Sequence, residues 1–483
     1  MSLKILFITA EAAPFAKTGG LADVAGSLPK ALAALGHDVR VVMPAYALIE
    51  QALQEGRWGL RAAGPTLRVP ILGGIAAGVM EARLPGSDVP VHFVAERSLF
   101  DRPGLYGYAD DAYRFAFFSR AALYLTLEIL QWRPDVVHAH DWHAAAAILW
   151  LATGGSRDRL SRDLPTVFTI HNLLHQGRTS TDILRYLDAG GPQLWEEGPG
   201  EVNLMARGIY HATMINTVSP TYASEILRPD GGIGLDGLLR YRQFDVHGIL
   251  NGLDDELWDP ARDRHLQATY DADSIDRRAE NKRALQARLD LPVRPDVPLV
   301  AMVSRLDVQK GVDLVAPVVN WLLERSDGEA QFAILGSGTA EYEHAFRRLA
   351  ERHPQRVAAV LTYDPVLAPM MYAGSDVFLM PSRFEPCGLG QLIAMRYGCV
   401  PVVRATGGLA DTVRDGITGF TFGLYDRTSF LEALQRALAV YRSNPEEWCE
   451  IQRRGMEQDF SWAASAKRYQ QVYEWAIARA RGG

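Results

Sequence analysis

The sequence contains few cysteines, and they are not arranged as a metal site or a disulfide framework. They form no CxxC motif and are Cys387, Cys399 and Cys449. Disulfide-stapled secreted domains have even sets of cysteines at short spacings, and structural zinc sites usually have CxxC pairs. We therefore expect three reduced thiols in a cytoplasmic protein.

Long apolar runs are lacking as well. The longest candidate, residues 144–152, has half of the ~18 residues that a membrane-spanning helix needs. The apolar run at residues 5–8 is soon followed by Glu11, so it fits a first strand better than a secretory signal. The sequence therefore predicts no membrane partner.

There is also no basic block. Lys and Arg number 50 against 57 Asp and Glu, which gives a net charge of −7. This balance argues against nucleic acid or an anionic membrane as the main partner. It still allows a small anionic substrate, because a few local cations can hold one. At 483 residues the chain is long enough for two or three domains.

The dinucleotide fingerprint GxGxxG is missing from the start of the chain. Residues 4–9 predict a strand, residues 11–20 a loop and residues 21–35 a helix with apolar residues at helical spacing, after which a second strand follows. This is a parallel βαβ opening, with a kink expected at Pro29. The loop ends in KTGG, whose glycines are adjacent and preceded by a lysine. A nicotinamide cofactor is therefore not expected.

Polar residues end the next strands of the N-terminal half. A strand at 135–139 ends in HAHDWHAA, a strand at 166–170 ends at His171, and the apolar run 246–250 ends at Asn251. The carboxyl ends of parallel strands meet at one edge of a sheet, where open α/β folds bind ligands. The histidines of HAHDWHAA are spaced i, i+2 and i+5 with no cysteine beside them, which is not a usual zinc pattern, so we predict no metal there.

The second half repeats this organisation. Polar residues over 259–298 lead into a new series of strands that begins at 299–303. The strand at 377–380 delivers Glu385 to the start of a helix, where free backbone N–H groups lie. A lone acid at this place would serve only the helix dipole, but the neighbouring strands also end in polar loops. We predict an α/β fold of two Rossmann-like, doubly wound domains that face each other across a deep cleft.

Eight motifs, taken in order, resemble a known family. They read KTGGLADV, HAHDW, TVFTIHN, NTVSP, GILNGLD, SRLDVQKG, SRFEPCGLGQ and TGGLADTV. The ordered set resembles bacterial glycogen synthase and plant starch synthase, which are retaining glycosyltransferases of the GT-B fold with a nucleoside diphosphate glucose donor. The resemblance implies an acceptor-side domain at 1–248, a donor-side domain at 249–458, and a last helix at 459–483 that packs back on the N-terminal domain.

The resemblance also implies roles at the reaction centre. Arg305 and Lys310 are expected to stabilise charge on the leaving diphosphate in place of a metal. Glu385 is expected to bind the 3- and 4-hydroxyls of the sugar; a covalent nucleophile is the alternative to the front-face displacement more often described for the family. Asp141 and His171 are expected near the reacting sugar. Solvated loop charges and a core histidine are the plain alternatives for the two cations and for His171.

A larger set is implied to contact the donor or the growing chain. Its members lie in loops and helix starts after the strands, and they are Lys17, Gly19, Gly20, Asp23, Asn251, Gly336, Tyr363, Cys387, Gly388, Leu389, Thr406, Gly407 and Gly408. The glycines after Lys17 allow close approach because they have no Cβ, and those after Thr406 are expected, with Thr406, to lend N–H groups to phosphate. Asp23 is equally well read as a helix acid, and Tyr363, placed like an adenine-stacking aromatic, as a surface aromatic. Arg207 stands where many relatives have lysine.

Together these features imply a glycogen or starch synthase that transfers glucose from ADP-glucose to the non-reducing end of an α-1,4-glucan, with retention and without a cofactor. Alternatives of the same class use UDP-glucose, or another acceptor as in sucrose or trehalose synthesis. A nucleotide-sugar epimerase of the same fold and a non-enzymatic glucan-binding protein are further alternatives. The expected partners are ADP-glucose and glycogen or maltooligosaccharides, with no nucleic acid.

Overall fold

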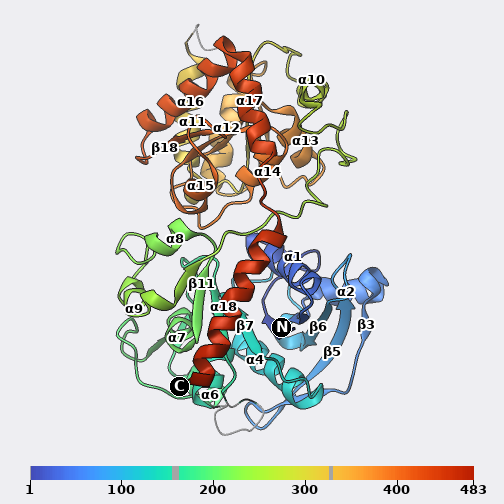
Figure 1. Ribbon diagram of the computed structural model, residues 1–483, viewed down its shortest axis with the longest axis vertical. Coiled ribbons are helices and arrows are strands. Elements are labelled where there is room, and N and C mark those ends of the chain that lie inside the picture. The colour runs from blue at the N-terminus through green and yellow to red at the C-terminus, as the bar shows by residue number, and fades with distance from the viewer. Residues whose placement is uncertain (1, 155–160, 162, 326–329, 483) are drawn as a thin grey trace. The chain divides into compact units, whose positions relative to one another are not determined.

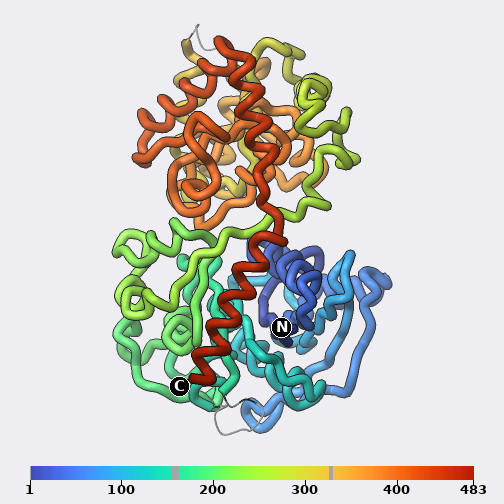
Figure 2. Tube along the Cα trace, viewed as in Figure 1, coloured from blue at the N-terminus to red at the C-terminus, as the bar shows by residue number. Residues whose placement is uncertain are grey.

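The computed structural model describes residues 2–154, 161, 163–325 and 330–482. The chain divides into two compact units: unit 1 comprises residues 1–252 and 462–483, and unit 2 comprises residues 253–461. The chain crosses between them twice (Figure 2), and the two crossing segments pair, because the N–H of Leu253 donates to the carbonyl of Phe460 at 2.7 Å. The boundaries therefore fall at this pairing, a few residues after the expected 248/249 and 458/459.

Unit 1 is built on a ten-stranded sheet of order β12-β11-β8-β7-β1-β2-β6-β5-β3, with β4 paired to β5. The strands are β1 (Lys4–Ile8), β2 (Asp38–Pro44), β3 (Arg61–Ala62), β4 (Leu67–Val69), β5 (Ile75–Arg83), β6 (Pro90–Ala95), β7 (Val136–His140), β8 (Thr166–Ile170), β11 (Met214–Thr217) and β12 (Val246–Gly248). Those from β12 to β6 run parallel. β7 and β8 are buried at every position, as parallel strands covered on both faces should be.

The helices of unit 1 cover this sheet (Figure 1). They are α1 (Gly20–Ala34), α2 (Ala47–Gln54), α3 (Arg97–Phe100), α4 (Asp111–Tyr124), α5 (Asp141–Thr153), α6 (Asp182–Leu187), α7 (Leu204–His211), α8 (Pro220–Glu225), α9 (Asp236–Tyr241) and α18 (Trp462–Gly482). The last helix, α18, packs against α1 and against β7, β8 and β11. Helix α1 contains Pro29, at which a kink was expected, and is assigned as one helix on both sides of it. A short antiparallel pair, β9 (Arg178–Ser180) and β10 (Glu201–Asn203), lies apart from the main sheet.

Unit 2 has a six-stranded parallel sheet of order β15-β14-β13-β16-β17-β18. Its strands are β13 (Leu299–Val303), β14 (Gln331–Leu335), β15 (Val357–Val360), β16 (Val377–Met380), β17 (Val400–Arg404) and β18 (Phe420–Phe422). Its helices are α10 (Arg278–Arg288), α11 (Val312–Leu323), α12 (Ala340–Arg352), α13 (Leu367–Gly374), α14 (Gly390–Arg396), α15 (Gly407–Thr412), α16 (Arg427–Ser443) and α17 (Pro445–Met456).

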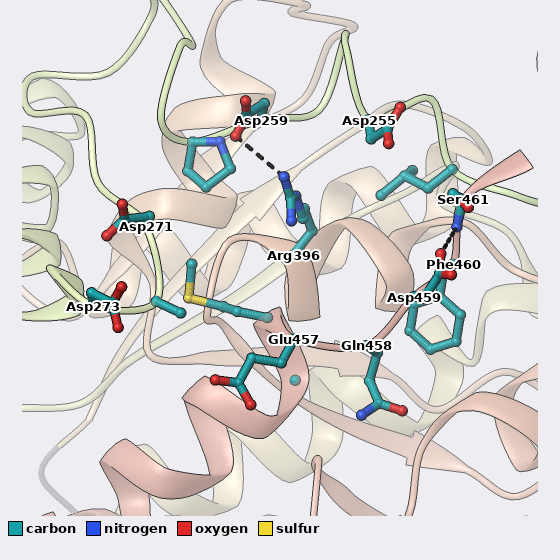
Figure 3. A pocket seen from close by; sticks show the side chains of 15 residues that line it. Asp255, Asp259, Asp271, Asp273, Arg396, Glu457, Gln458, Asp459, Phe460 and Ser461 are labelled. Carbon is teal, nitrogen blue, oxygen red and sulfur yellow. Dashed lines mark hydrogen bonds and ion pairs between the residues drawn. The ribbon is translucent and has the colours of Figure 1, made fainter. Parts of the chain in front are cut away.

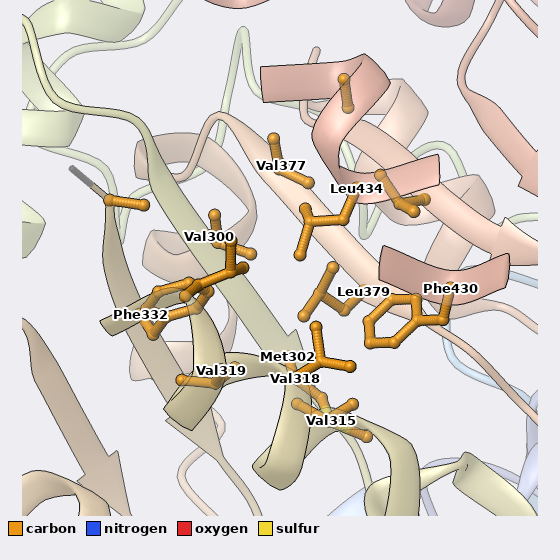
Figure 4. Close-up of a cluster of buried hydrophobic side chains, with 14 of the residues drawn as sticks. Val300, Met302, Val315, Val318, Val319, Phe332, Val377, Leu379, Phe430 and Leu434 are labelled. Atoms are coloured by element: carbon orange, nitrogen blue, oxygen red, sulfur yellow. The ribbon is translucent and has the colours of Figure 1, made fainter. Parts of the chain in front are cut away.

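Apolar side chains from both layers lock the sheet of unit 2 to its helices. Figure 4 shows Val300 and Met302 of β13 beside Leu379 of β16, with Val315 of α11 and Phe430 of α16 closing over them. Burial of a side chain of this size contributes about 1.5–3 kcal/mol. The core therefore fixes the strand ends from which the polar loops start.

In each unit the carboxyl ends of the parallel strands share one edge of the sheet. In unit 1 this edge carries the loops after β1, β7, β8 and β12, and in unit 2 those after β13, β14, β16 and β17. No helix in the described parts of the chain is both long enough and apolar enough to cross a membrane.

Candidate active site

The predicted site residues fall into two groups, one at the carboxyl edge of each sheet. We call the group in unit 1 the N-terminal half-site; its members are Lys17, Gly19, Gly20, Asp23, Asp141, His171 and Asn251. We call the group in unit 2 the C-terminal half-site; its members are Arg305, Lys310, Gly336, Tyr363, Glu385, Cys387, Gly388, Leu389, Thr406, Gly407 and Gly408.

The glycine loop after β1 is clamped by a buried carboxylate that sequence reasoning missed. Glu11 accepts from the N–H and the hydroxyl of Thr18, at 2.5 and 2.7 Å, and from the N–H of Gly19 at 3.3 Å. The hydroxyl of Tyr106 donates to the same carboxylate at 2.6 Å. An acid at the end of a strand, directly before a glycine loop, is the signal that could have identified Glu11. The clamp fixes the loop in front of α1.

Gly19 and Gly20 are not required by packing inside the protein. A Cβ added to either would meet no atom within 4 Å, whereas a Cβ on Gly26 would lie 2.6 Å from the carbonyl oxygen of Ala13. Gly19 also has an extended backbone that any residue can adopt. No atom of the described chain fills the space in front of these two glycines. This is expected of a loop that a ligand approaches closely. Lys17 beside it forms an ion pair with Asp23 at 2.6 Å.

Asp141 occupies a strained position directly after β7. Its φ of 54° lies in the left-handed region, which a non-glycine residue adopts only when its surroundings enforce it. The N–H of His171 donates to its carboxylate at 2.8 Å. Burial raises the pKa of Asp141 to about 7, although the N–H groups of His171 and Asn172 lower it. Asp141 can therefore hold or release a proton near neutral pH.

The histidines at the ends of β7 and β8 are neutral, and the rings of His138, His140 and His171 are hydrogen-bonded within the protein. Burial lowers the pKa of His138, His140 and His143 well below the ordinary value, and that of His171 to about 3. The ring nitrogens of His140 and His171 lie 3.0 Å apart. Over the described ranges, no group of three or more His, Cys, Asp and Glu side chains is placed to bind a metal.

Asn251 ends the β12 segment with an unsatisfied polar atom. The residue is 5% exposed, and within the described part of the chain its Oδ1 has no hydrogen-bond partner. A buried acceptor left unpaired costs about 1–3 kcal/mol unless a ligand supplies a donor. Asn251 therefore has an acceptor available for a ligand, and its contact with one stays a prediction.

A pocket of about 440 Å³ is formed mainly by the residues that come shortly after His171 in the sequence. It is lined by Trp142, Leu174, His175, Gln176, Gly177, Arg178 and Ile233. Gly177 has φ +63°, and a Cβ there would lie 2.2 Å from the ring of Trp142. Glycine therefore lets the Trp142 ring form one wall of this pocket, next to Asp141 in the sequence.

The C-terminal half-site contains a partly buried ion pair between two of the predicted catalytic residues. Lys310 Nζ lies 2.6 Å from Glu385 Oε2, and the hydroxyl of Ser382 donates to the same oxygen at 3.1 Å. Gly311 follows the lysine with φ +74°, and a Cβ there would be 2.0 Å from the carbonyl oxygen of Pro381. Only glycine allows the two loops to approach this closely, so Gly311 brings the lysine to the glutamate.

Glu385 keeps one oxygen free for a ligand, and Arg305 is open to solvent. Among the described residues, no hydrogen bond reaches Glu385 Oε1. The side chain of Arg305 is 63% exposed and forms a 3.2 Å ion pair with Asp307. Lys310 is thus held by Glu385 in a partly buried ion pair. The ion pair of Arg305 with Asp307 is exposed to solvent, so it holds the Arg305 side chain only weakly.

The loops after β16 and β17 pack backbone to backbone, which engages two of the amides expected to bind phosphate. The N–H of Gly408 donates to the carbonyls of Glu385 and Pro386, both at 3.2 Å, and the N–H of Thr406 donates to Arg404 at 2.9 Å. These two N–H groups are engaged inside the protein in this structure, and their donation to phosphate stays a prediction that would require them to leave these partners. A Cβ on Gly407 would lie 2.0 Å from the Glu385 carbonyl oxygen, so this glycine serves loop packing.

Other amides at this edge remain open. In the part of the chain that the structure describes, no group accepts from the N–H of Gly388 or of Leu389, which precede α14. Cys387 is buried, and its carbonyl accepts from Gln391 at 3.1 Å. Gly336 has φ +150°, and a Cβ there would be 1.8 Å from the Ser304 carbonyl oxygen, so it serves loop packing.

Tyr363 and Arg207, both noted in the sequence, lie in opposite environments. The side chain of Tyr363 is 81% exposed after β15, so its ring is open to a stacking partner. Arg207, the departure noted in the sequence, is buried in α7 and forms a two-point ion pair with Glu197 at 2.6 and 2.8 Å. Arg207 therefore holds the chain around Glu197 in place.

Unit 2 also contains an acidic cavity of about 440 Å³, shown in Figure 3. Its carboxylates are Asp255, Asp259, Asp271, Asp273, Glu457 and Asp459, and Arg396 lies 3.3 Å from Asp259. It contains none of the predicted site residues. The excess of carboxylates disfavours an anionic ligand, so the cavity does not compete with the C-terminal half-site for a diphosphate.

Comparison with known proteins matches both units. The family described as "Starch synthase catalytic domain" matches residues 4–241, and "Glycosyl transferases group 1" matches residues 297–439. The chain is 46% identical to a glycogen synthase of Moorella thermoacetica over 490 residues, covering 99% of this chain and 98% of the relative. It is also 46% identical to a glycogen synthase of Anaeromyxobacter over 488 residues, covering 98% and 99%.

A solved structure gives the same result. The catalytic domain of starch synthase IV from Arabidopsis thaliana, bound to ADP and acarbose, matches with a TM-score of 0.90 and 34% identity, covering 99% of this chain and 100% of that one. The predicted fold class of two Rossmann-like domains is confirmed as GT-B. Nearly half of all positions are shared with relatives over their whole length, and the chain therefore belongs to the glycogen synthase family.

Proposed function

We propose that the chain is a retaining glycogen synthase that transfers glucose from ADP-glucose to the non-reducing end of an α-1,4-glucan and releases ADP. The observation that carries the proposal is the Lys310–Glu385 pair at the carboxyl edge of the unit 2 sheet, in a chain of this family. The names of the relatives and the ADP and acarbose in the Arabidopsis structure support the donor and the glucan.

The C-terminal half-site binds the donor in this proposal. Cleavage at the sugar C1 places negative charge on the leaving diphosphate, which Arg305 and Lys310 stabilise. Glu385 Oε1 accepts from the sugar hydroxyls, while its other oxygen stays with Lys310. The N–H groups of Gly388 and Leu389 bind further donor oxygens. The two cations supply the charge that a metal would supply, so no cofactor is required.

The N-terminal half-site contacts the transferred sugar and the acceptor in this proposal. Gly19 and Gly20 leave room for a close approach, and the unpaired Oδ1 of Asn251 accepts from a hydroxyl. Asp141 binds hydroxyl groups either as an acid or as an anion near neutral pH. The pocket beside Trp142 accommodates further units of the glucan.

The ion pair favours front-face displacement over a covalent glucosyl–enzyme. The ammonium group and the hydroxyl on Oε2 lower the basicity of the carboxylate, and its free Oε1 is occupied by the sugar hydroxyls in this proposal. In the proposed step the C1–O bond to phosphate breaks, the acceptor 4-hydroxyl oxygen bonds to C1 on the same face, and its proton passes to the leaving phosphate oxygen. The three cysteines form no disulfide in the described chain, and two of them are buried, which supports a reducing cytoplasmic setting.

The test is transfer of radiolabelled glucose from ADP-glucose and, in parallel, from UDP-glucose into glycogen. Glu385→Ala should lower incorporation by about 10²-fold or more, the size of effect seen when a transition-state contact is removed. Glu432→Ala changes an exposed acid of α16 and should leave incorporation unchanged. Incorporation from neither donor would refute the synthase proposal, and a preference for UDP-glucose would refute the choice of donor.

A further inference from the structure

A directed chain of hydrogen bonds runs through the core of unit 1. Its members are fully buried polar side chains from α18, β7, β8 and β11, and they are Tyr473, His138, Thr169, Asn216 and Tyr469. Tyr473 Oη lies 2.9 Å from His138 Nδ1, His138 Nε2 lies 2.5 Å from Thr169 Oγ1, and Thr169 Oγ1 donates to Asn216 Oδ1 at 2.5 Å. Asn216 Nδ2 then donates to Tyr469 Oη at 3.1 Å.

The direction of this chain fixes the tautomer of His138. Thr169 has one hydroxyl proton and gives it to Asn216, so it must accept from His138 Nε2–H. Burial lowers the pKa of His138, so the ring is neutral and its Nδ1 has no proton. Nδ1 therefore accepts from the hydroxyl of Tyr473. Tyr473 of α18 thus fixes the His138 ring, and His140 and His171 lie beyond it towards the N-terminal half-site.

The ring of His140 lies on this fixed ring and also contacts His171. The ring centroids of His138 and His140 are 4.0 Å apart, and His140 Nδ1 lies 3.0 Å from His171 Nε2. His140 Nε2 is buried, and within the described residues it has no partner. A buried N–H without an acceptor is rarer in proteins than a buried acceptor without a donor. The proton of His140 therefore belongs on Nδ1, from which it is donated to His171 Nε2.

The tautomer of His171 follows. Its ring is neutral and carries one proton, and its Nε2 accepts from His140, so the proton is on Nδ1. In the described part of the chain His171 Nδ1 has no partner, and it is not among the enclosed polar atoms, so it is open to a ligand.

We propose that His140 is a positioning residue that holds His171 as the Nδ1–H tautomer, so that His171 meets the bound sugar as a hydrogen-bond donor and not as a base. The part of this inference that concerns the sugar rests on the proposed function. It removes His171 as acceptor of the hydroxyl proton, which is consistent with transfer of that proton to the departing phosphate oxygen. The tautomer itself rests on contacts inside unit 1 alone.

The experiment reads the tautomer directly. Protein labelled with ¹⁵N-histidine should give, for His171, a protonated-type shift at Nδ1 and an unprotonated-type shift at Nε2, assigned from the signals lost in His171→Gln. His140→Leu removes the donor and should move the His171 signals towards the Nε2–H form. His140→Asn keeps an N–H close to the position of Nδ1 and should keep the wild-type pattern. His344→Leu, which changes an exposed histidine of α12, is the control.

Activity separates positioning from structural damage. His140→Leu should lower kcat for glucan synthesis roughly tenfold or more with little change in KM for ADP-glucose, and His140→Asn should restore most of it. A wild-type spectrum with the proton on Nε2 of His171 would overturn the inference, even if His140→Leu does not fold. An unchanged tautomer in folded His140→Leu would overturn it too. A wild type that makes no glucan would refute the proposed function and leave the tautomer result standing.

Discussion

Lowering the pH from 7 to 5.5 should destabilise unit 1 by about 6 kcal/mol, because unit 1 contains buried histidines that stay neutral while the unit is folded. Burial keeps His138, His140, His143 and His171 neutral in the folded state. In the unfolded chain each binds a proton below its ordinary pKa of 6.5. The unfolded state therefore binds more protons, and stability falls as the pH falls below 6.5.

The magnitude follows from these shifts. Between pH 7 and 5.5 each neutral histidine lowers the free energy of unfolding by about 1.3 kcal/mol, so four lower it by about 5 kcal/mol. Asp141 acts in the opposite direction, because its folded pKa of about 7 lies above its ordinary 3.8 and the folded state binds the extra proton. It restores about 1.6 kcal/mol over the same interval. His92 and His211, whose pKa burial lowers to about 4, each add about 1.2 kcal/mol to the loss, which brings the net loss to about 6 kcal/mol.

Urea unfolding at a series of pH values tests this prediction. A chain with two units need not unfold in one step, so the transition of unit 1 is followed by hydrogen exchange of peptides that span 136–140 and 166–170. His138→Gln should reduce the loss by about 1.3 kcal/mol, whereas His344→Gln, at an exposed site, should not change it. Stability that is flat or rises between pH 7 and 5.5 would refute the assignment of these histidines as neutral.

Two further predictions concern glycine and arginine. Gly26→Ala should lower the free energy of unfolding by about 1–3 kcal/mol, because the new Cβ meets the Ala13 carbonyl at 2.6 Å. Gly19→Ala should leave the melting temperature unchanged and reduce glucan synthesis. Equal thermal stability of the two variants would contradict this. Arg207→Met leaves the buried carboxylate of Glu197 unpaired and should cost about 3–5 kcal/mol in urea unfolding. A cost below about 1 kcal/mol would mean that water replaces the guanidinium.

Much of the fold and part of the site could be predicted from the sequence. Buried parallel strands appear as short apolar runs, and the residues after them must lie on one edge of the sheet. For this reason His171, Asn251 and Glu385 were placed correctly at the ends of β8, β12 and β16 without knowledge of their contacts. The same rule could not predict β18, because three residues are too few for a periodic signal.

The partners of polar groups could not be predicted. His138 and Tyr473 are 335 positions apart, and only packing of α18 on the sheet brings them together. The pairing of the Gly408 N–H with the Glu385 loop could not be expected either, because it depends on the close approach of two loops that are separated in the sequence. These outcomes depend on tertiary contacts, which local patterns do not contain.

The two half-sites differ in the charge around their central groups, and this difference matches the chemistry proposed for them. In unit 1 the Lys17–Asp23 ion pair lies at the glycine loop, but the buried histidines within and after the strands carry no charge, and burial holds the pKa of Asp141 near neutral pH. Such groups suit the hydroxyls of a sugar, which carry no charge. Unit 2 instead contains charged groups, because Lys310 forms an ion pair with Glu385 and Arg305 forms one with Asp307. A diphosphate that binds there can draw on both cations while each keeps its carboxylate, so charge that develops on the leaving group meets cations already in place.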